Sequence, residues 1–176
     1  MVTALYRALA GAPSRVKEPV LSQWLAARGR EEERRSARAR AREEGALKEL
    51  LRDLHWPGQG WEPELLLVAL HTYFAIMGKL LAAPLLGFSY PRQAGNGELE
   101  EWLTGLEGHP FFPLADGEEG GSFSWYLKAW TPPLARAFLQ LVGRLRAYDH
   151  TRRPGEGADL LRPLYYSLLP PAVESV

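Results

Sequence analysis

The chain has 176 residues, of which 46% are hydrophobic and 24% are charged, and its formal net charge is zero. A chain of this length can bury roughly 70% of the surface that its unfolded form exposes, which favours a folded domain over disorder. It contains no cysteine, and this excludes disulfide scaffolds, thiolate zinc sites and cysteine nucleophiles. Arg7 interrupts the apolar stretch near the N-terminus, so we expect no secretory signal and a cytoplasmic location.

The neutral total hides an uneven distribution of charge. Residues 1–62 carry 12 basic and 9 acidic side chains, residues 63–122 carry 2 and 8, and residues 123–176 carry 7 and 4. The local balances are therefore +3, −6 and +3. Basic faces near the two ends are candidate contacts for a polyanion, whereas the middle of the chain would repel one.

The first 44 residues are expected to form a separate N-terminal part, a helix followed by a charged arm or linker. Residues 2–10 have the spacing of a weak amphipathic helix, and a second helix is expected from about Glu18. Residues 28–44 hold seven arginines and five glutamates and almost no apolar side chain larger than alanine. Because such a segment cannot bury a face, we expect a solvated helix or a linker.

The same arginine-rich segment supports a sharper alternative, an arm that contacts the phosphates of a nucleic acid backbone. Arginines that neutralise phosphates release counterions, and this release favours binding. The interleaved glutamates cancel most of the positive field, so the solvated-helix interpretation is preferred. The candidate backbone contacts are Arg34, Arg35, Arg38 and Arg42.

Residues 45–176 are expected to form one helical domain around a central helix at residues 63–83. This segment is the longest near-continuous apolar run, with Pro63 suited to a first helical position and Pro84 to a stop. It is long enough to span a bilayer, but a charge at mid-span costs roughly 3 kcal/mol on insertion scales. Since Lys79 lies within the segment, we favour a buried core helix and expect no membrane.

Lys79 is the most unusual residue of this predicted helix. A buried ammonium must reach solvent or pair with a carboxylate, and we expect an ion pair that stabilises the fold. A contact with phosphate or with another domain is the functional alternative. His71, in the same segment, is expected to be a core histidine with a satisfied hydrogen bond.

Apolar residues at helical spacing predict further helices on both sides of the central one. Thr131 and Pro132 form an N-cap and first-turn signature, and the helix that follows would turn Arg136, Arg144 and Arg146 outward. Together these patterns predict an all-α fold, an irregular bundle of about six or seven helices around the central apolar helix. The other predicted helical segments are residues 46–54, 98–106, 122–130 and 159–170.

No active site is predicted from these patterns. The four histidines share no metal-ligand spacing, and no serine stands in the G-x-S-x-G setting of a nucleophile. Three G-x-G tripeptides follow no strand pattern, so we interpret them as turns. We therefore predict no catalytic, cofactor-binding or metal-binding residue in this chain.

Three blocks of sequence carry a resemblance to a known family. They are LHTYFAIMGKLLAA (residues 70–83), SFSWYLKAW (122–130) and DLLRPLYYSLLP (159–170). The residues of these blocks and their order resemble the helical region upstream of the catalytic core in type IIG-like adenine-specific DNA methyltransferases of restriction-modification systems. The resemblance covers roughly residues 45–170. In that family a glycine-rich cofactor loop and an Asn-Pro-Pro-aromatic catalytic motif follow, and neither occurs in this sequence.

The resemblance implies a non-catalytic module, or a fragment, that braces a methyltransferase core supplied in cis or in trans. Methylation of adenine flips the base into a pocket beside the methyl donor, so S-adenosylmethionine is expected only in that core. The chain would be a split subunit or the remnant of an interrupted gene. An apolar surface patch should mark where the core docks, and the candidates are Trp125, Tyr126, Tyr165 and Tyr166.

A second interpretation stays open, a free-standing helical module that binds another protein or a nucleic acid without any methyltransferase partner. A reading frame immediately downstream with the family's Tyr-Thr-Pro and Asn-Pro-Pro-aromatic motifs would favour the first interpretation. Its absence would favour the second.

Overall fold

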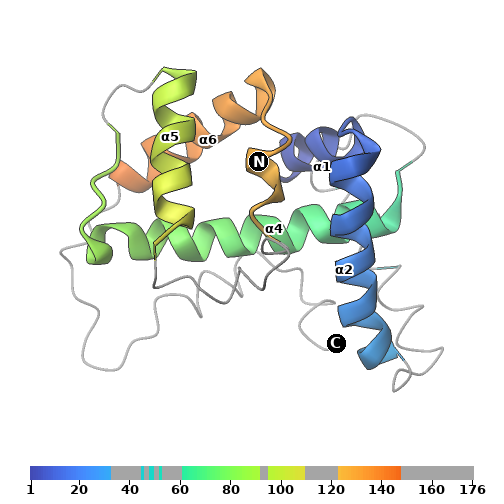
Figure 1. Cartoon of the computed structure of the whole chain (residues 1–176). Helices are drawn as coiled ribbons and strands as arrows, with labels where there is room; N and C mark the ends of the chain where they lie inside the picture. The colour runs from blue at the N-terminus through green and yellow to red at the C-terminus, as the bar shows by residue number, and fades with distance from the viewer. Residues whose placement is uncertain are drawn as a thin grey trace. The chain divides into compact units, whose positions relative to one another are not determined.

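The computed structural model describes residues 1–32, 45, 48–49, 52, 61–91, 95–109 and 123–147, and every regular element within these ranges is helical (Figure 1). This confirms the all-α class. Five α-helices and two 3-10 helices occur there, against six or seven helices expected, and two predicted segments fall largely or wholly outside the described ranges. The elements are α1 (Val2–Ala10), α2 (Ser14–Glu32), α4 (Pro63–Ala82), η1 (Ala83–Leu86), α5 (Asn96–Glu107), η3 (Trp125–Leu127) and α6 (Pro132–Ala147).

Two elements differ from their predicted form. Helix α2 begins at Ser14 rather than near Glu18, because the Pro13 carbonyl already accepts two backbone N–H bonds from the next turn. The short helix predicted over residues 122–130 is reduced to the three-residue 3-10 helix η3, whose turn is closed by i→i+3 bonds. Such bonds have poorer geometry than those of an α-helix, and runs of this kind stay short.

The chain divides into two compact units. Unit 1 comprises Met1–Trp24 and Glu64–Asp149, and unit 2 comprises Leu25–Pro63 and His150–Val176. Unit 1 contains all the buried hydrophobic side chains of the described residues. The predicted boundary after residue 44 falls inside unit 2, mostly outside the described ranges, and stays a prediction.

Helix α4 is the apolar helix on which unit 1 is built. Pro63 occupies its first position, and the Glu64 carboxylate complements the positive end of the helix dipole. The α-helix ends at Ala82, and η1 follows with Pro84 in its first turn. Gly87 closes η1 at φ +84°, a left-handed conformation that glycine adopts without steric cost.

By length and composition alone, α4 is also the one helix of the described residues that qualifies as a candidate membrane span. Its most apolar 18-residue window has a mean hydropathy of 1.8, and 61% of that window is buried within the protein. Core helices of soluble proteins pass the same test of length and composition. A helix that is apolar on nearly all sides has to be buried, and the burial of α4 within the protein fits a core helix.

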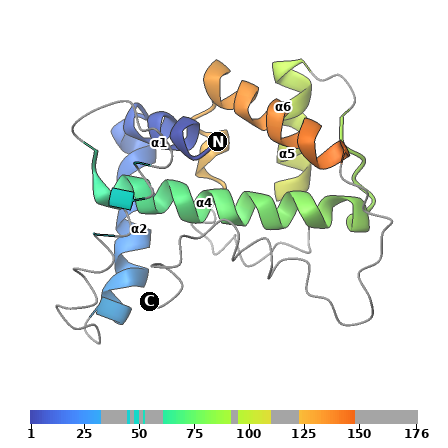
Figure 2. The ribbon, with the colours of Figure 1, turned by 180° about the vertical axis from the view of Figure 1, so that it is seen from behind.

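Helices α1, α5 and α6 lie on one side of α4 (Figures 1 and 2). Helix α6 packs against both α1 and α5, and α1 also contacts η3. The N-cap predicted at Thr131 is present, since its hydroxyl accepts the Leu134 backbone N–H at 3.4 Å. Each covering helix buries its apolar side, with Leu5 and Leu9 of α1, Leu99, Leu103 and Leu106 of α5, and Leu134, Phe138 and Val142 of α6 at most 2% exposed.

Candidate functional site

A buried ionic cluster joins three elements of unit 1. Lys79 lies in the last turn of α4, Glu107 ends α5, and Tyr126 lies in η3. The Lys79 Nζ group pairs with Glu107 Oε2, and the Tyr126 hydroxyl donates a hydrogen bond of 2.6 Å to Glu107 Oε1. The three residues of this Lys79–Glu107–Tyr126 cluster are each at most 9% exposed. The ion pair expected for Lys79 is therefore present, with Glu107 as its partner.

Electrostatics explain why the Tyr126 phenol acts here as a donor. Burial raises the pKa of Tyr126 well above 10, and the charge of Glu107 and the hydrogen bond to it raise this pKa further. The phenol therefore keeps its proton at neutral pH and donates a hydrogen bond to the Glu107 carboxylate. Because both Glu107 oxygens accept bonds, its charge is compensated, whereas an unpaired buried charge costs several kcal/mol. The arrangement ties α4, α5 and η3 together.

The sequence pattern indicated Lys79 as a buried charge but did not indicate Glu107 as its partner. A signal for Glu107 was present, because it follows Leu103 by four residues and Leu99 by eight and so lies on the buried face of α5. A glutamate on the buried face of one helix and a lysine on the buried face of another are expected to form an ion pair, because each charge needs a partner. Their pairing depends on how α4 and α5 cross, and helical spacing within one segment carries no information on that crossing.

A second buried link joins α4 to η3. The Trp125 indole N–H donates to Thr72 Oγ1 at 2.8 Å, and the Thr72 hydroxyl donates in turn to the Val68 carbonyl at 2.7 Å. The hydroxyl thus accepts one bond and donates another. Trp125 belongs to the block at 122–130 and Thr72 to the block at 70–83. Two of the three blocks that carry the family resemblance therefore contact each other in the core of unit 1.

The docking surface expected at four aromatic residues requires a correction for two of them. Trp125 is 3% exposed and Tyr126 is 1% exposed. Their polar groups bond Thr72 and Glu107 inside unit 1, so both are core residues and neither offers apolar surface to a partner. The other predicted site residues, Tyr165, Tyr166, Arg34, Arg35, Arg38 and Arg42, lie outside the described residues.

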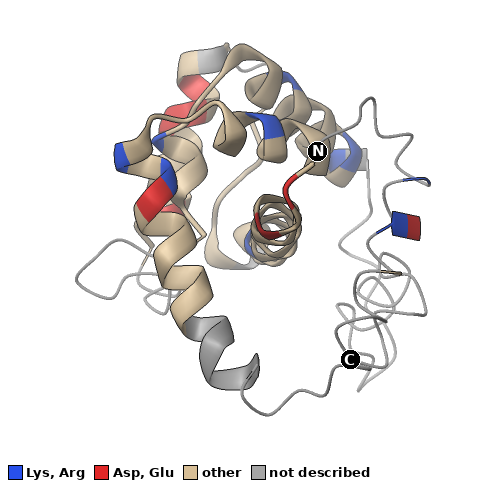
Figure 3. Ribbon diagram, turned by 90° about the vertical axis from the view of Figure 1, so that its right-hand side faces the viewer, with Lys and Arg blue, Asp and Glu red and all other residues tan. Residues whose placement is uncertain are grey.

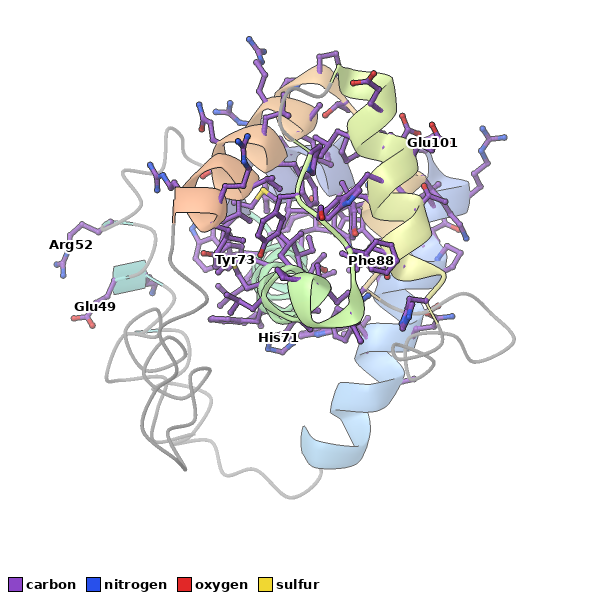
Figure 4. The ribbon with its side chains drawn as sticks, turned by 90° about the vertical axis from the view of Figure 1, so that its left-hand side faces the viewer. Glu49, Arg52, His71, Tyr73, Phe88 and Glu101 are labelled. Atoms are coloured by element: carbon purple, nitrogen blue, oxygen red, sulfur yellow. The ribbon has the colours of Figure 1, made fainter. Side chains whose placement is uncertain are left out.

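The prediction for His71 was wrong about its location. His71 is exposed, and its ring lies on the side of α4 away from α5 and α6 (Figure 4). Its Nδ1 accepts a hydrogen bond of 3.2 Å from the Trp24 indole N–H, so the expected satisfied bond is present. Among the described residues, no group of three His, Asp or Glu side chains converges in a way that could hold a metal ion.

An aromatic corner connects η1 to α5. The Phe88 ring meets the rings of Trp102 and His109 edge-on, at centroid distances of 6.5 Å and 5.6 Å. The Trp102 indole donates to the Ser89 carbonyl at 3.0 Å, and the Tyr90 hydroxyl donates to the Leu80 carbonyl at 2.7 Å. Burial raises the pKa of Tyr90 to about 12. Figure 4 shows Phe88 beside α5, and these contacts hold residues 88–90 against α5 and the end of α4.

Charges are segregated between α5 and α6, two of the three helices that cover α4. Helix α5 carries Glu98, Glu100, Glu101 and Glu107 and no basic residue, whereas α6 carries only basic charges (Figure 3). The α6 arginines predicted to face outward, Arg136, Arg144 and Arg146, are all exposed.

No family model, curated protein or solved structure matches the chain. The class that the described residues define is an all-helical protein whose apolar core encloses a paired charge.

Proposed function

We propose that this chain is a non-catalytic helical module of a type IIG-like adenine-specific DNA methyltransferase, which braces a methyltransferase core supplied in cis or in trans. The observation that supports it is the Trp125–Thr72 hydrogen bond of 2.8 Å. It joins two of the three blocks on which the family resemblance rests, so residues of those blocks are linked by one packing arrangement. A shared arrangement is a physical reason for the blocks to occur together.

The proposed role is architectural. Lys79, Glu107 and Tyr126 bind one another inside unit 1. Their polar groups therefore stabilise the packing of the helices. Flipping and methylating adenine require a base pocket beside S-adenosylmethionine, and in this proposal the core provides both. The proposal also places the protein in the cytoplasm, in contact with DNA and not with a membrane.

The test uses the chain together with the polypeptide encoded immediately downstream of it. The two are produced separately and together, and transfer of labelled methyl groups from S-adenosylmethionine to adenine in DNA is measured. We expect the two proteins to co-purify, methylation to need both, and the chain alone neither to bind S-adenosylmethionine nor to methylate DNA. Tight binding of S-adenosylmethionine by the chain alone would overturn the proposal. A downstream core that is equally active without the chain would favour the free-standing interaction module.

The arginine-rich arm stays a separate part of the proposal. Replacing Arg34, Arg35 and Arg38 by glutamine should flatten the dependence of DNA affinity on salt if the arm contacts phosphates. An unchanged dependence would remove the arm from the proposal and leave the architectural role intact.

A further inference from the structure

The exposed charged side chains of α1 and of residues 123–147 are all basic. Helix α1 contains Arg7 and no acidic residue, and residues 123–147 contain four basic residues and no acidic one. All five basic side chains are exposed. In Figure 4, side chains with nitrogen tips project outward from α6, and Glu101 lies on the outer side of α5. A positively charged surface attracts a polyanion, and the attraction acts over distances shorter than the screening length of the salt solution.

Three of the exposed polar residues follow one line along α6. Arg136, Gln140 and Arg144 stand at i, i+4 and i+8, and all three are exposed. Residues four apart occupy the same helical face, and eight residues span about 12 Å of helix axis. The major groove of B-DNA is also about 12 Å wide, so the two guanidinium groups can contact phosphates on either side of it. No acidic residue of the described ranges pairs with either arginine.

Gly143 adds an independent observation on the same face. It follows Arg136 by seven residues and is exposed, and a Cβ built there would meet no atom within 4 Å. Internal packing therefore gives no reason for glycine, although glycine in a helix interior costs about 0.5–1 kcal/mol relative to alanine. A residue without a side chain leaves room for a partner to approach the helix backbone beside Arg144.

We propose that the α6 face formed by Arg136, Gln140, Gly143 and Arg144 binds the phosphate backbone of double-stranded DNA. Arginine suits this role because its planar guanidinium donates bidentate hydrogen bonds to phosphate. Contacts of this kind position a protein on the duplex without reading its sequence. The inference rests on the proposed function only for the choice of DNA as the polyanion, since charge and spacing come from α6 itself.

The test measures binding of the full chain to a short fluorescein-labelled DNA duplex by anisotropy, over a series of salt concentrations. The double variant R136Q/R144Q removes two charges from the face. The matched control, R15Q/K17Q, removes two charges from α2. We expect R136Q/R144Q to lower the slope of log affinity against log salt by about 1.8, since each phosphate contact contributes about 0.9. The control should keep the wild-type slope, and circular dichroism should show both variants folded.

A wild-type slope in folded R136Q/R144Q would overturn the proposal, and so would the absence of DNA binding by the wild-type chain. If the variant instead loses its downstream partner in co-purification and keeps its affinity for DNA, the face binds an acidic protein surface and the proposal is wrong. Failure of the proposed function can be distinguished from failure of this inference, because the two have separate measurements. If the downstream core methylates DNA equally well without the chain, the proposed function is wrong, but the salt dependence of DNA binding by the chain is unchanged.

Discussion

The hydroxyl of Tyr126 donates a hydrogen bond of 2.6 Å to Oε1 of Glu107, and the other oxygen of that carboxylate pairs with Lys79. The three residues come from three elements that are separated in the sequence. Removing any one of them therefore disturbs the fit of the other two, which makes the cluster the most informative place to perturb the fold.

Replacing Tyr126 with phenylalanine should destabilise the fold by about 1–3 kcal/mol, because Glu107 Oε1 would be left buried without its donor. Urea unfolding followed by circular dichroism measures this change. Tyr73→Phe is the matched control, since Tyr73 is only half-buried, and it should change the stability by less than about 0.5 kcal/mol. Equal effects of the two substitutions would show that the hydrogen bond does not matter to stability.

Breaking the ion pair from one side should cost more than removing both charges. Lys79→Met or Glu107→Leu alone leaves a buried charge without its partner, at a cost of about 3–5 kcal/mol. The double variant removes both charges, so its loss of stability should be clearly smaller than the sum of the single losses. A double-mutant cycle from urea unfolding tests this, and simple additivity of the two losses would contradict it.

Stability should fall in alkali because of Tyr126. The pKa of this phenol is near 10 in the unfolded chain and is raised well above 10 by burial and by Glu107 in the folded one. Below the unfolded pKa both states hold the proton and the bond contributes fully. As the pH rises above about 10, the unfolded state releases its proton first, so the free energy of unfolding decreases until the folded pKa is reached. Urea midpoints measured through this range should fall more steeply for the wild type than for Tyr126→Phe.

Replacing Thr72 with valine should cost about 1–3 kcal/mol, because the buried indole N–H of Trp125 would lose its acceptor. Thr104→Val is a suitable control, since the Thr104 hydroxyl donates to the Glu100 carbonyl at an exposed position of α5. The control should stay within about 0.5 kcal/mol of the wild type. Thermal and urea unfolding of the two variants, compared side by side, decide the point.

Two glycines should respond to alanine in opposite directions. Gly143→Ala should raise the free energy of unfolding by about 0.5–1 kcal/mol, because the helix interior has room for the methyl group. Gly87→Ala should lower it by about 1–2 kcal/mol, because φ is +84° at that position. Urea unfolding measures both changes, and a loss of stability in Gly143→Ala would mean that the exposed face of α6 is not open.

Helical periodicity and punctuation predicted much of the fold. Pro63 begins α4 and Thr131 caps α6, as their positions in the sequence indicated, and α4 ends at Ala82, two residues before the predicted stop at Pro84. The outward direction of Arg136 and Arg144 was predicted in the same way, because both stand off the apolar stripe of their helix. These are local properties, since a residue's face on a helix depends only on its spacing from its neighbours.

Aromatic residues were harder to interpret. Trp125 and Tyr126 resembled surface anchors in the sequence, and the fold buries them because Thr72 and Glu107 provide partners for their polar groups. His71 was expected in the core, and it is exposed because it lies on the side of α4 away from α5 and α6. An aromatic or amphipathic side chain suits either environment, so its own pattern does not decide between them.

The sequence by itself determined that the described chain is helical, which helix is the apolar one and that the charge of Lys79 within it needs a partner. Only the tertiary structure decided that the partner is Glu107, that Tyr126 completes the cluster and that Arg136 and Arg144 of α6 pair with no described carboxylate. The reason is physical. Secondary structure follows from interactions within a few residues, whereas the pairing of buried polar groups follows from how whole helices cross, which depends on the shape of all the side chains packed between them.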